Sequence, residues 1–352
     1  MTQRPITPAR RKKIKRLLAS MNKQNLRFIP VAPPLVEMMD LVIEAEELDY
    51  LLKMGTKTHD FDQAKALGAM PADRFQAFFD RLQRKGYVHI ERDRDGRPAY
   101  RLAAIAVGWY ETMMHYSVGK PYEKEFSEKW NAFFQFFQKF NVFPIRNIQN
   151  VVMPKILTPS QDTALMQPEA RGRKGKINLP VNTKLTHDTK IYPSFQVDDL
   201  VDEYGQKDSI CIFPCVCRHG AQVVGSACDF SIPRESCMAF GTMAAAWASW
   251  GYGRYISREE ARDILSEVRE KGAIHSVIHE KEDSRLPVQA ICNCCWDCCG
   301  ILKPYNMGAI AIMYNASFSA QVKDDADCKT CGNCVKYCPT TAMRAPLTSL
   351  MT

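Results

Sequence analysis

The sequence predicts an α+β fold in which a cysteine-free first part is followed by a cysteine-rich second part. Three observations support this expectation. Apolar residues recur at helical spacing through much of the first part, the pattern changes to the alternation typical of strands at residues 87–102, and all 14 cysteines lie between Cys211 and Cys338. Because the first 210 residues contain no cysteine, we place the main boundary of the chain near residue 200.

Basic residues gather at the amino-terminal end. Residues 1–30 carry nine Lys and Arg residues and no acids, whereas the whole chain has a net charge of +8. The basicity therefore belongs to this segment, which we interpret as an arm over residues 1–40. Such an arm can bind nucleic acid or an acidic partner, or it can be a solvated tail. Both interpretations stay open at this point.

Three helices and a hairpin are expected next. The apolar spacing predicts helices over residues 41–54, 61–67 and 71–85. The strand pattern of residues 87–90 and 99–102 flanks Asp95-Gly96, which is a strong tight-turn signal. This order of elements resembles winged helix-turn-helix domains over residues 41–103. The resemblance implies either DNA binding through the third helix or a protein-docking role, and the acids interleaved with the arginines favour docking.

A helical segment and an extended connection are expected between this domain and the cysteines. Six aromatic residues form a stripe at helical spacing on the second helix of residues 104–143: Trp130, Phe133, Phe134, Phe136, Phe137 and Phe140. A stripe of this kind is typical of a core or a dimer seam. Residues 144–200 contain several prolines and little periodicity. A segment of this length without regular structure indicates a contact with a partner or subunit.

The first cysteine block reads Cys211-x3-Cys215-x-Cys217-Arg218-x9-Cys228-x8-Cys237. Four thiolates can hold either an iron–sulfur cluster or zinc, but structural zinc sites use two paired knuckles, which this spacing lacks. We therefore expect a [4Fe–4S] cluster, with zinc as the alternative and Cys211 as a spare. Arg218 would offset part of the negative charge of the ligands. The expected ligands are Cys215, Cys217, Cys228 and Cys237.

The C-terminal run has the most specific spacing in the chain. Cys328-x2-Cys331-x2-Cys334-x3-Cys338-Pro339 is the pattern of bacterial [4Fe–4S] ligation. Upstream, five cysteines occupy the eight positions from 292 to 299, a density that packing does not require. Together these blocks resemble bacterial two-cluster ferredoxins over about residues 290–345.

The ferredoxin resemblance implies a ligand assignment, because the fourth cysteine of each run ligates the other cluster in that family. One cluster would be held by Cys292, Cys295, Cys298 and Cys338. The other would be held by Cys328, Cys331, Cys334 and either Cys294 or Cys299. The chain departs from the family at Leu302, where the fourth cysteine of the first run is expected, and Cys299 is our choice because it is nearest to that position.

The expected function follows from these blocks. The combination of the winged-helix pattern, the Cys-x-Cys-Arg block and the ferredoxin run looks like uncharacterised 4Fe–4S dicluster proteins of strict anaerobes. Three [4Fe–4S] clusters would use 12 of the 14 cysteines. There is no nucleotide-binding glycine loop and no catalytic triad. We therefore expect an electron-transfer protein or subunit that relays single electrons to or from a partner oxidoreductase in anaerobic metabolism. A redox-responsive regulator that binds DNA is the alternative, and an enzyme with a substrate-binding cluster ranks third.

The expected organisation and location complete the sequence-based picture. No window of about 18 apolar residues and no export signal are found, so we expect a cytoplasmic protein without a membrane span. The expected partner is a redox protein or a larger oxidoreductase complex, and a homo-oligomer and DNA are further options. The expected segments are the arm (1–40), the winged-helix-like domain (41–103), the helical segment (104–143), the connection (144–200), the Cys-x-Cys-Arg domain (201–290) and the ferredoxin-like domain (291–352).

Overall fold

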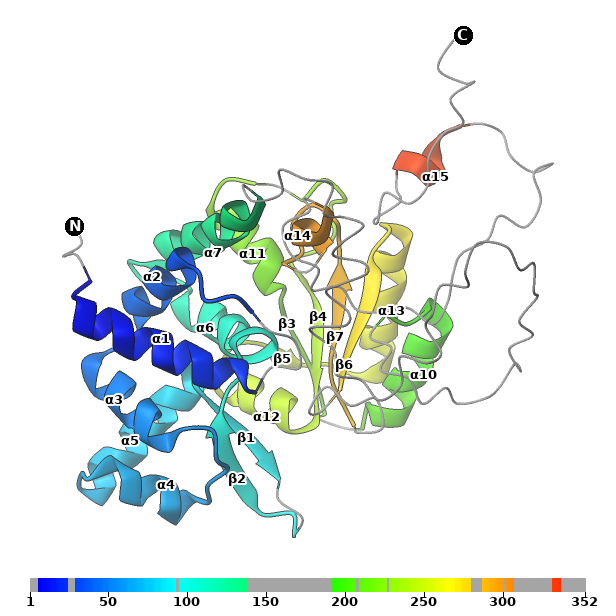
Figure 1. Cartoon of the computed structure of the whole chain (residues 1–352). Helices are drawn as coiled ribbons and strands as arrows, with labels where there is room; N and C mark the ends of the chain where they lie inside the picture. Colours follow the sequence, from blue (N-terminus) through cyan, green and yellow to red (C-terminus); the bar gives the residue numbers. More distant parts are fainter. Residues whose placement is uncertain are drawn as a thin grey trace, which may run out of the picture.

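The computed structural model has the α+β architecture that the sequence predicts, with helices around two antiparallel sheets (Figure 1). The structure describes residues 6–24, 29–92, 95–138, 191–206, 209–226, 228–279, 287–300, 302–306 and 331–336. Most of the expected connection and most of the expected ferredoxin-like domain lie outside these residues. No helix among the described residues is long and apolar enough to cross a membrane.

The described part of residues 6–138 consists of helices and one hairpin. Its elements are α1 (Pro8–Asn22), α2 (Pro33–Val42), α3 (Ala45–Met54), α4 (Phe61–Gly68), α5 (Ala72–Arg84), β1 (Val88–Arg92), β2 (Pro98–Leu102), the π-helical turn η1 (Ile105–Trp109), α6 (Tyr110–Ser117) and α7 (Glu123–Gln138). Local sequence explains several helix starts. The Asp60 side chain accepts a hydrogen bond from the Gln63 backbone at 2.8 Å and Gln63 bonds back to Asp60, which is a capping box.

The segment expected to be a basic arm is instead part of the core. Residues Ile14, Leu17, Leu18 and Met21 of α1 are all fully buried. Their spacing of three, four and seven residues places them on one face of the helix, and the cations occupy the other face. The boundary expected at residue 40 therefore does not separate an arm from a domain, because apolar periodicity outweighs the high local charge.

The aromatic stripe of α7 also belongs to the core. Trp130, Phe133 and Phe134 are buried, and Trp130 stacks on Tyr110 of α6 with ring centroids 3.8 Å apart. These contacts agree with the core interpretation of the stripe.

A five-stranded antiparallel sheet dominates the second half, in the order β5-β3-β4-β7-β6. Its elements are α10 (Ser194–Tyr204), β3 (Ile210–Pro214), α11 (Val216–Val223), β4 (Glu235–Phe240), α12 (Gly241–Ser249), β5 (Arg254–Tyr255), α13 (Arg258–Glu270), β6 (Ile274–His279) and β7 (Val288–Cys294), followed by the short helices α14 (Leu302–Asn306) and α15 (Asn333–Lys336). The helix α10 occupies the end of the segment expected to be an extended connection.

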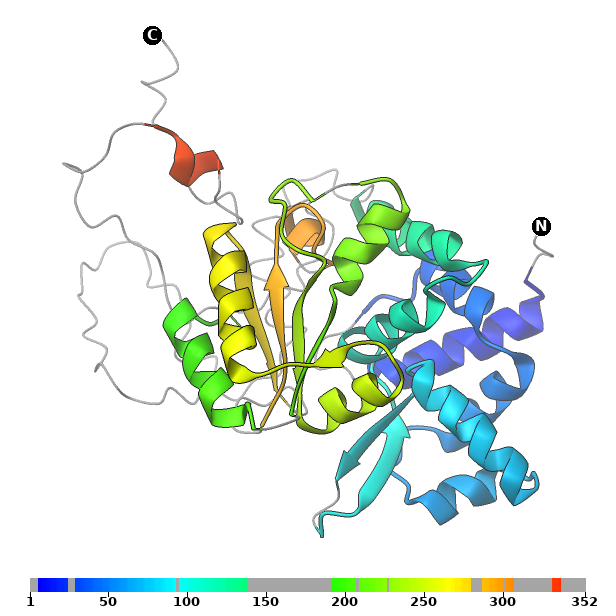
Figure 2. The same ribbon diagram turned by 180° about the vertical axis from the view of Figure 1, so that it is seen from behind.

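The two faces of this sheet pack against different helices (Figures 1 and 2). Ile212, Met238 and Ile291 join a core with α10 and α13. Phe213 and Cys237 point to the opposite face and pack with α12. Because successive side chains of a strand alternate between faces, the cysteines of β4 and β7 are directed to the α12 side. The amino-terminal helices lie on this same side of the sheet (Figures 1 and 2).

Gly86 provides a testable feature of the turn from α5 into β1. Its φ is +76°, and a Cβ at this position would lie 2.6 Å from Thr112 Cβ. We expect Gly86→Ala to lower the free energy of unfolding by about 2 kcal/mol, because it combines a left-handed backbone with a steric clash. Gly96 is the matched control, since its φ is +77° and nothing lies within 4 Å of its Cβ position. Urea denaturation should show a smaller loss for Gly96→Ala, and equal losses would mean that the contact with Thr112 is unimportant.

Candidate metal centres

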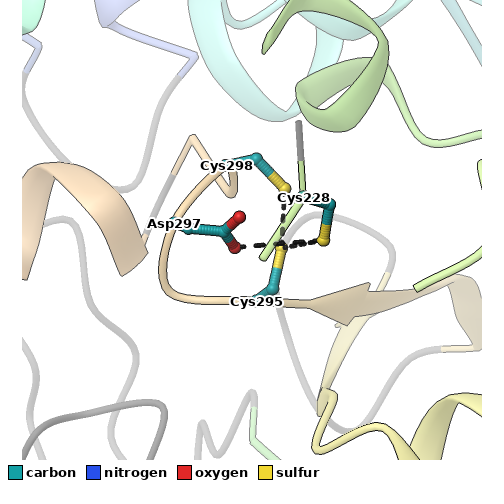
Figure 3. Close-up of side chains that lie close together, drawn as sticks. All are labelled: Cys228, Cys295, Asp297 and Cys298. Atoms are coloured by element: carbon teal, nitrogen blue, oxygen red, sulfur yellow. Dashed lines mark hydrogen bonds between the residues drawn. The ribbon is translucent and has the colours of Figure 1, made fainter. Parts of the chain in front are cut away.

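Three thiols and one carboxylate converge where the chain leaves β7 (Figure 3). The ligand atoms of Cys228, Cys295, Asp297 and Cys298 all lie within 4.8 Å of one another, and we call this group the Cys228 site. The Sγ atoms of Cys295 and Cys298 are 2.6 Å apart, and those of Cys228 and Cys295 are 3.7 Å apart. This group could hold a metal ion.

Local structure explains how the Cys228 site forms. Cys295 follows the last residue of β7, and the turn after it carries Asp297 and Cys298 back towards the loop that contains Cys228. The backbone N–H of Asp229 donates to Asp297 Oδ2 at 2.7 Å, which orients the carboxylate and joins the two loops. Asp297 is the site residue that the sequence reasoning missed. The signal that could have found it is its position as the only acid in the loop of residues 295–299.

The thiols of the Cys228 site perturb one another's ionisation. Contacts with the Cys295 and Cys298 thiols hold the pKa of Cys228 far below its usual range. The same contact with Cys228 raises the pKa of Cys295 to about 12. Negative charge in this group is therefore favoured at Cys228, and a bound cation would compete for the protons of the other thiols.

Six further cysteines form a second group on the α12 side of the sheet. Hydrogen bonds connect Cys215 with Cys217 and with Cys237. Others connect Cys217 with Cys299, Cys237 with Cys292, and Cys299 with Cys294. Cys292 also packs against Cys294 and Cys299, so contacts connect all six thiols. We call this group the six-thiol ring; its members are Cys215, Cys217, Cys237, Cys292, Cys294 and Cys299.

Cys215 is the member of the ring where negative charge is favoured. It is the N-cap residue of α11, and hydrogen bonds from the Cys217 and Cys237 thiols lower its pKa well below the usual range. The backbone N–H of Arg218 and the Arg218 charge act in the same direction. A helix N-terminus stabilises a thiolate for the same reason that it stabilises other anions.

Arg218 lies between the two groups and is almost completely buried, with 1% of its surface exposed. It donates to Pro233 O at 2.7 Å, Ser236 Oγ at 2.9 Å and Asn293 O at 3.2 Å. Its Nη2 also lies 3.9 Å from Cys295 Sγ.

The buried charge of Arg218 has thiols rather than carboxylates around it. Within the described residues it forms no ion pair with a carboxylate, and its Nε is buried without a hydrogen-bond partner. Cys215 and Cys237 of the ring and Cys295 and Cys298 of the Cys228 site raise its pKa, against the opposing effect of burial. Because an isolated buried cation is strongly unfavourable, Arg218 needs a counter-charge, and Cys215 is the neighbouring thiol whose lowered pKa favours the thiolate.

The structure groups the cysteines differently from the sequence-based assignment. Cys215, Cys217 and Cys237 come together as expected, but Cys228 lies with Cys295 and Cys298. Cys292 was grouped with Cys295 and Cys298, yet it lies in the ring. The physical reason is strand alternation, since Cys292 and Cys294 share one face of β7 whereas Asn293 and Cys295 are directed away from it.

The remaining cysteines are placed in part. Cys211 is buried on β3, where burial raises its pKa to about 11 and its Sγ lies 3.6 Å from Ile212 O. This fits the expectation that it is a spare thiol. Cys331 and Cys334 are exposed, and Cys328 and Cys338 lie outside the described residues. The expected cross-ligation of Cys338 stays a prediction.

Histidine side chains contribute support rather than ligands. His219 Nε2 lies 2.6 Å from Glu123 Oε1, so the imidazole of His219 is directed towards α7 instead of the sulfurs. His275 Nδ1 lies 2.6 Å from Asn293 Oδ1, which anchors β7 between the two thiol groups.

Comparisons of the chain with protein-family models, with curated proteins and with solved structures found no match.

Proposed function

We propose that the protein is an iron–sulfur electron-transfer protein or subunit that relays single electrons to or from a partner oxidoreductase. The observation that carries the proposal is the gathering of nine cysteines in two adjacent groups around one buried arginine. When bound, iron–sulfur clusters supply one-electron transfer at potentials set by their charge and surroundings. The residues of the chain fit this cofactor class, because the donors are thiol-rich and Arg218 Nε has no protein partner.

The closeness of the two groups supports electron relay. Cys294 belongs to the ring and Cys295 to the Cys228 site, and the same division separates Cys299 from Cys298. Consecutive Cα atoms are about 3.8 Å apart, so two centres held by neighbouring residues lie side by side. Zinc would suit three thiols and a carboxylate equally well, but six thiols in one ring exceed the four ligands of a structural zinc site.

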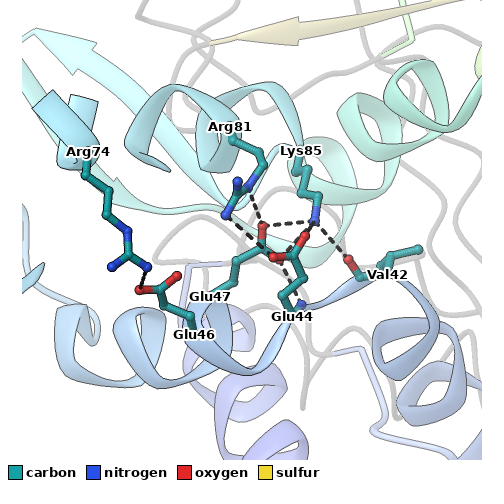
Figure 4. A network of polar contacts seen from close by, with 7 residues as sticks. All are labelled: Val42, Glu44, Glu46, Glu47, Arg74, Arg81 and Lys85. Atoms are coloured by element: carbon teal, nitrogen blue, oxygen red, sulfur yellow. Dashed lines mark hydrogen bonds and ion pairs between the residues drawn. The ribbon is translucent and has the colours of Figure 1, made fainter. Parts of the chain in front are cut away.

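The amino-terminal domain supports docking more than DNA binding. The order of α3, α4, α5, β1 and β2 matches the element order behind the winged-helix resemblance. Arg74 and Arg81 of α5 and its C-cap residue Lys85 are paired with acids of α3 (Figure 4). Arg74 pairs with Glu46 at 2.7 Å, and Lys85 pairs with Glu47 at 2.9 Å. Neutralised cations contribute little to phosphate binding, so we infer that this domain contacts a redox partner protein.

Metal analysis tests the proposed function. Purified without oxygen, the full chain should contain iron and acid-labile sulfide in equal amounts, at about four of each per four-iron cluster. Its visible absorption should bleach with dithionite and recover on reoxidation. Cys228→Ser/Cys298→Ser should remove part of the iron, because it deletes two thiols of the Cys228 site. Stoichiometric zinc with iron near zero would overturn the proposal.

A further inference from the structure

The six-thiol ring has a composition that a single four-iron cluster does not explain. We propose that the ring binds one polynuclear iron–sulfur cluster through all six thiolates, with more iron than a single [4Fe–4S] unit. The inference rests on the proposed function and deepens it, because it names the kind of cluster that one of the two groups takes. It differs from the sequence-based assignment, which divided five of these six cysteines among three clusters and left either Cys294 or Cys299 without one.

The continuity of the ring is the first argument. Cys215, Cys217, Cys237 and Cys292 pack in one cluster, and Cys292 also packs against Cys294 and Cys299. Because Cys217 is also hydrogen-bonded to Cys299, the contacts do not divide the six thiols into four ligands and a separate pair. A [4Fe–4S] unit takes four protein ligands. Two thiols would then lie unused in direct contact with the ligands. The spare Cys211 packs beside Cys215 and Cys237, but it does not line the cavity that all six ring thiols share.

The fold builds the ring from three separate elements, and this is the second argument. The register of β4 and β7 pairs Met238 with Ile291, so Cys237 lies opposite Cys292 on the α12 side of the sheet. The start of α11 adds Cys215 and Cys217. The turn after β7 returns Cys299 to the same side as Cys294. The six thiols are therefore brought together by sheet register, a helix N-terminus and a turn, and not by their proximity in sequence.

Space beside the ring is the third argument. All six thiols, together with Cys295 and Cys298 of the Cys228 site, line a cavity of about 490 Å³ between the sheet and the amino-terminal domain. Gly300 borders it, and a Cβ there would lie 3.2 Å from Cys217 Sγ and 3.5 Å from Trp130 Nε1. The absence of a side chain at residue 300 therefore keeps the ring open on the side of α7. A cavity lined by six thiols provides room for a group larger than one metal ion.

Charge gives the fourth argument. Arg218 adjoins the ring through Cys215 and Cys237, but one guanidinium offsets only one of the charges that six thiolates would carry. Ionising all six thiols therefore requires further positive charge, and a bound metal centre would supply it. Several ferrous or ferric ions bridged by sulfide supply it, and they match the soft thiolate donors.

The ring accounts for the inventory of cysteines. With six thiols in the ring and three in the Cys228 site, the C-terminal run keeps its own four, and only Cys211 remains of the 14. The surplus of the block at residues 292–299 is thereby explained, because this block serves two centres at once. The C-terminal run would then need no ligand from elsewhere in the chain.

The decisive experiment counts iron in the ring alone. The full chain carrying Cys228→Ser, Cys298→Ser, Cys331→Ser and Cys334→Ser removes ligands from the other two groups. Assembled without oxygen, it should retain more than about four iron atoms per chain. In this background each ring cysteine is replaced singly by Ala, and Cys211→Ala is the matched control. All six replacements should change the iron content or the electron paramagnetic resonance spectrum of the reduced protein, whereas Cys211→Ala should change neither.

Two results would overturn the inference without overturning the proposed function. One is an iron content of four or fewer in that background, and the other is two ring positions whose replacement changes nothing. If the multiple variant does not fold, native mass spectrometry of the wild-type chain decides instead. A total above about 12 iron atoms supports the six-thiolate cluster, since the other two groups hold about eight at most. A total between one and 12 overturns the inference alone, and no iron overturns the proposed function as well.

Discussion

Replacing Arg218 by methionine is expected to lower both the stability of the chain and the reduction potential of the metal centres. The variant leaves the buried carbonyl oxygen of Asn293 and the partly buried one of Pro233 without their donor, which should lower the free energy of unfolding of the metal-free chain by about 3 kcal/mol. It also removes a positive charge that adjoins thiols of both groups. Loss of this charge favours the more oxidised, less negative state of a thiolate-bound cluster, so the potential falls.

Two variants separate the contributions of charge and hydrogen bonding. Arg218→Lys keeps the charge but cannot reach every acceptor, so we expect reduced stability with a potential close to that of the wild type. Arg269 is the control on the far side of the sheet, where its pair with Asp198 is about one third exposed. Arg269→Met should cost less than about 1 kcal/mol and leave the potential unchanged. A redox titration in which Arg218→Met keeps the wild-type potential would show that this charge does not act on the centres.

Replacing Lys85 by methionine is expected to cause the largest loss of stability in the amino-terminal domain. Lys85 Nζ lies 2.9 Å from Glu47 Oε1, and the side chains are 5% and 0% exposed. Lys85 also donates to Val42 O at 3.2 Å (Figure 4). Removing it leaves the Glu47 carboxylate buried with Arg81 Nε at 3.2 Å as its main remaining cation. We expect a loss of about 3–5 kcal/mol in urea denaturation, because an uncompensated buried charge remains.

A double variant tests this explanation. Glu47→Leu combined with Lys85→Met removes both charges and should recover most of the lost stability, since an apolar pair avoids the cost of burying ions. Lys13 is the matched control, because its pair with Asp49 is about half exposed. Lys13→Met should change the free energy of unfolding by less than about 1 kcal/mol. A double variant as unstable as Lys85→Met would mean that the Lys85 side chain acts through packing rather than charge.

The elements of the amino-terminal half were largely predictable from local sequence. Gly86 and the Asp95-Gly96 turn marked where α5 ends and where the hairpin reverses. The main error concerned α1, which was expected to be part of an arm although Ile14, Leu17 and Leu18 follow helical spacing. Net charge describes the exposed face of a helix, and it does not tell whether the other face is buried.

The sequence by itself indicated that the cysteines have a chemical role, because their number and spacing exceed what packing requires. Only the tertiary structure decided which thiols share a site. Strand alternation sends Cys294 and Cys295 to opposite sides of the sheet, so neighbours in sequence serve different groups. The register of β4 and β7 then brings Cys237 to Cys292, and the turn after β7 brings Asp297 to Cys228. These contacts link residues far apart in the chain, so no local sequence pattern predicts them.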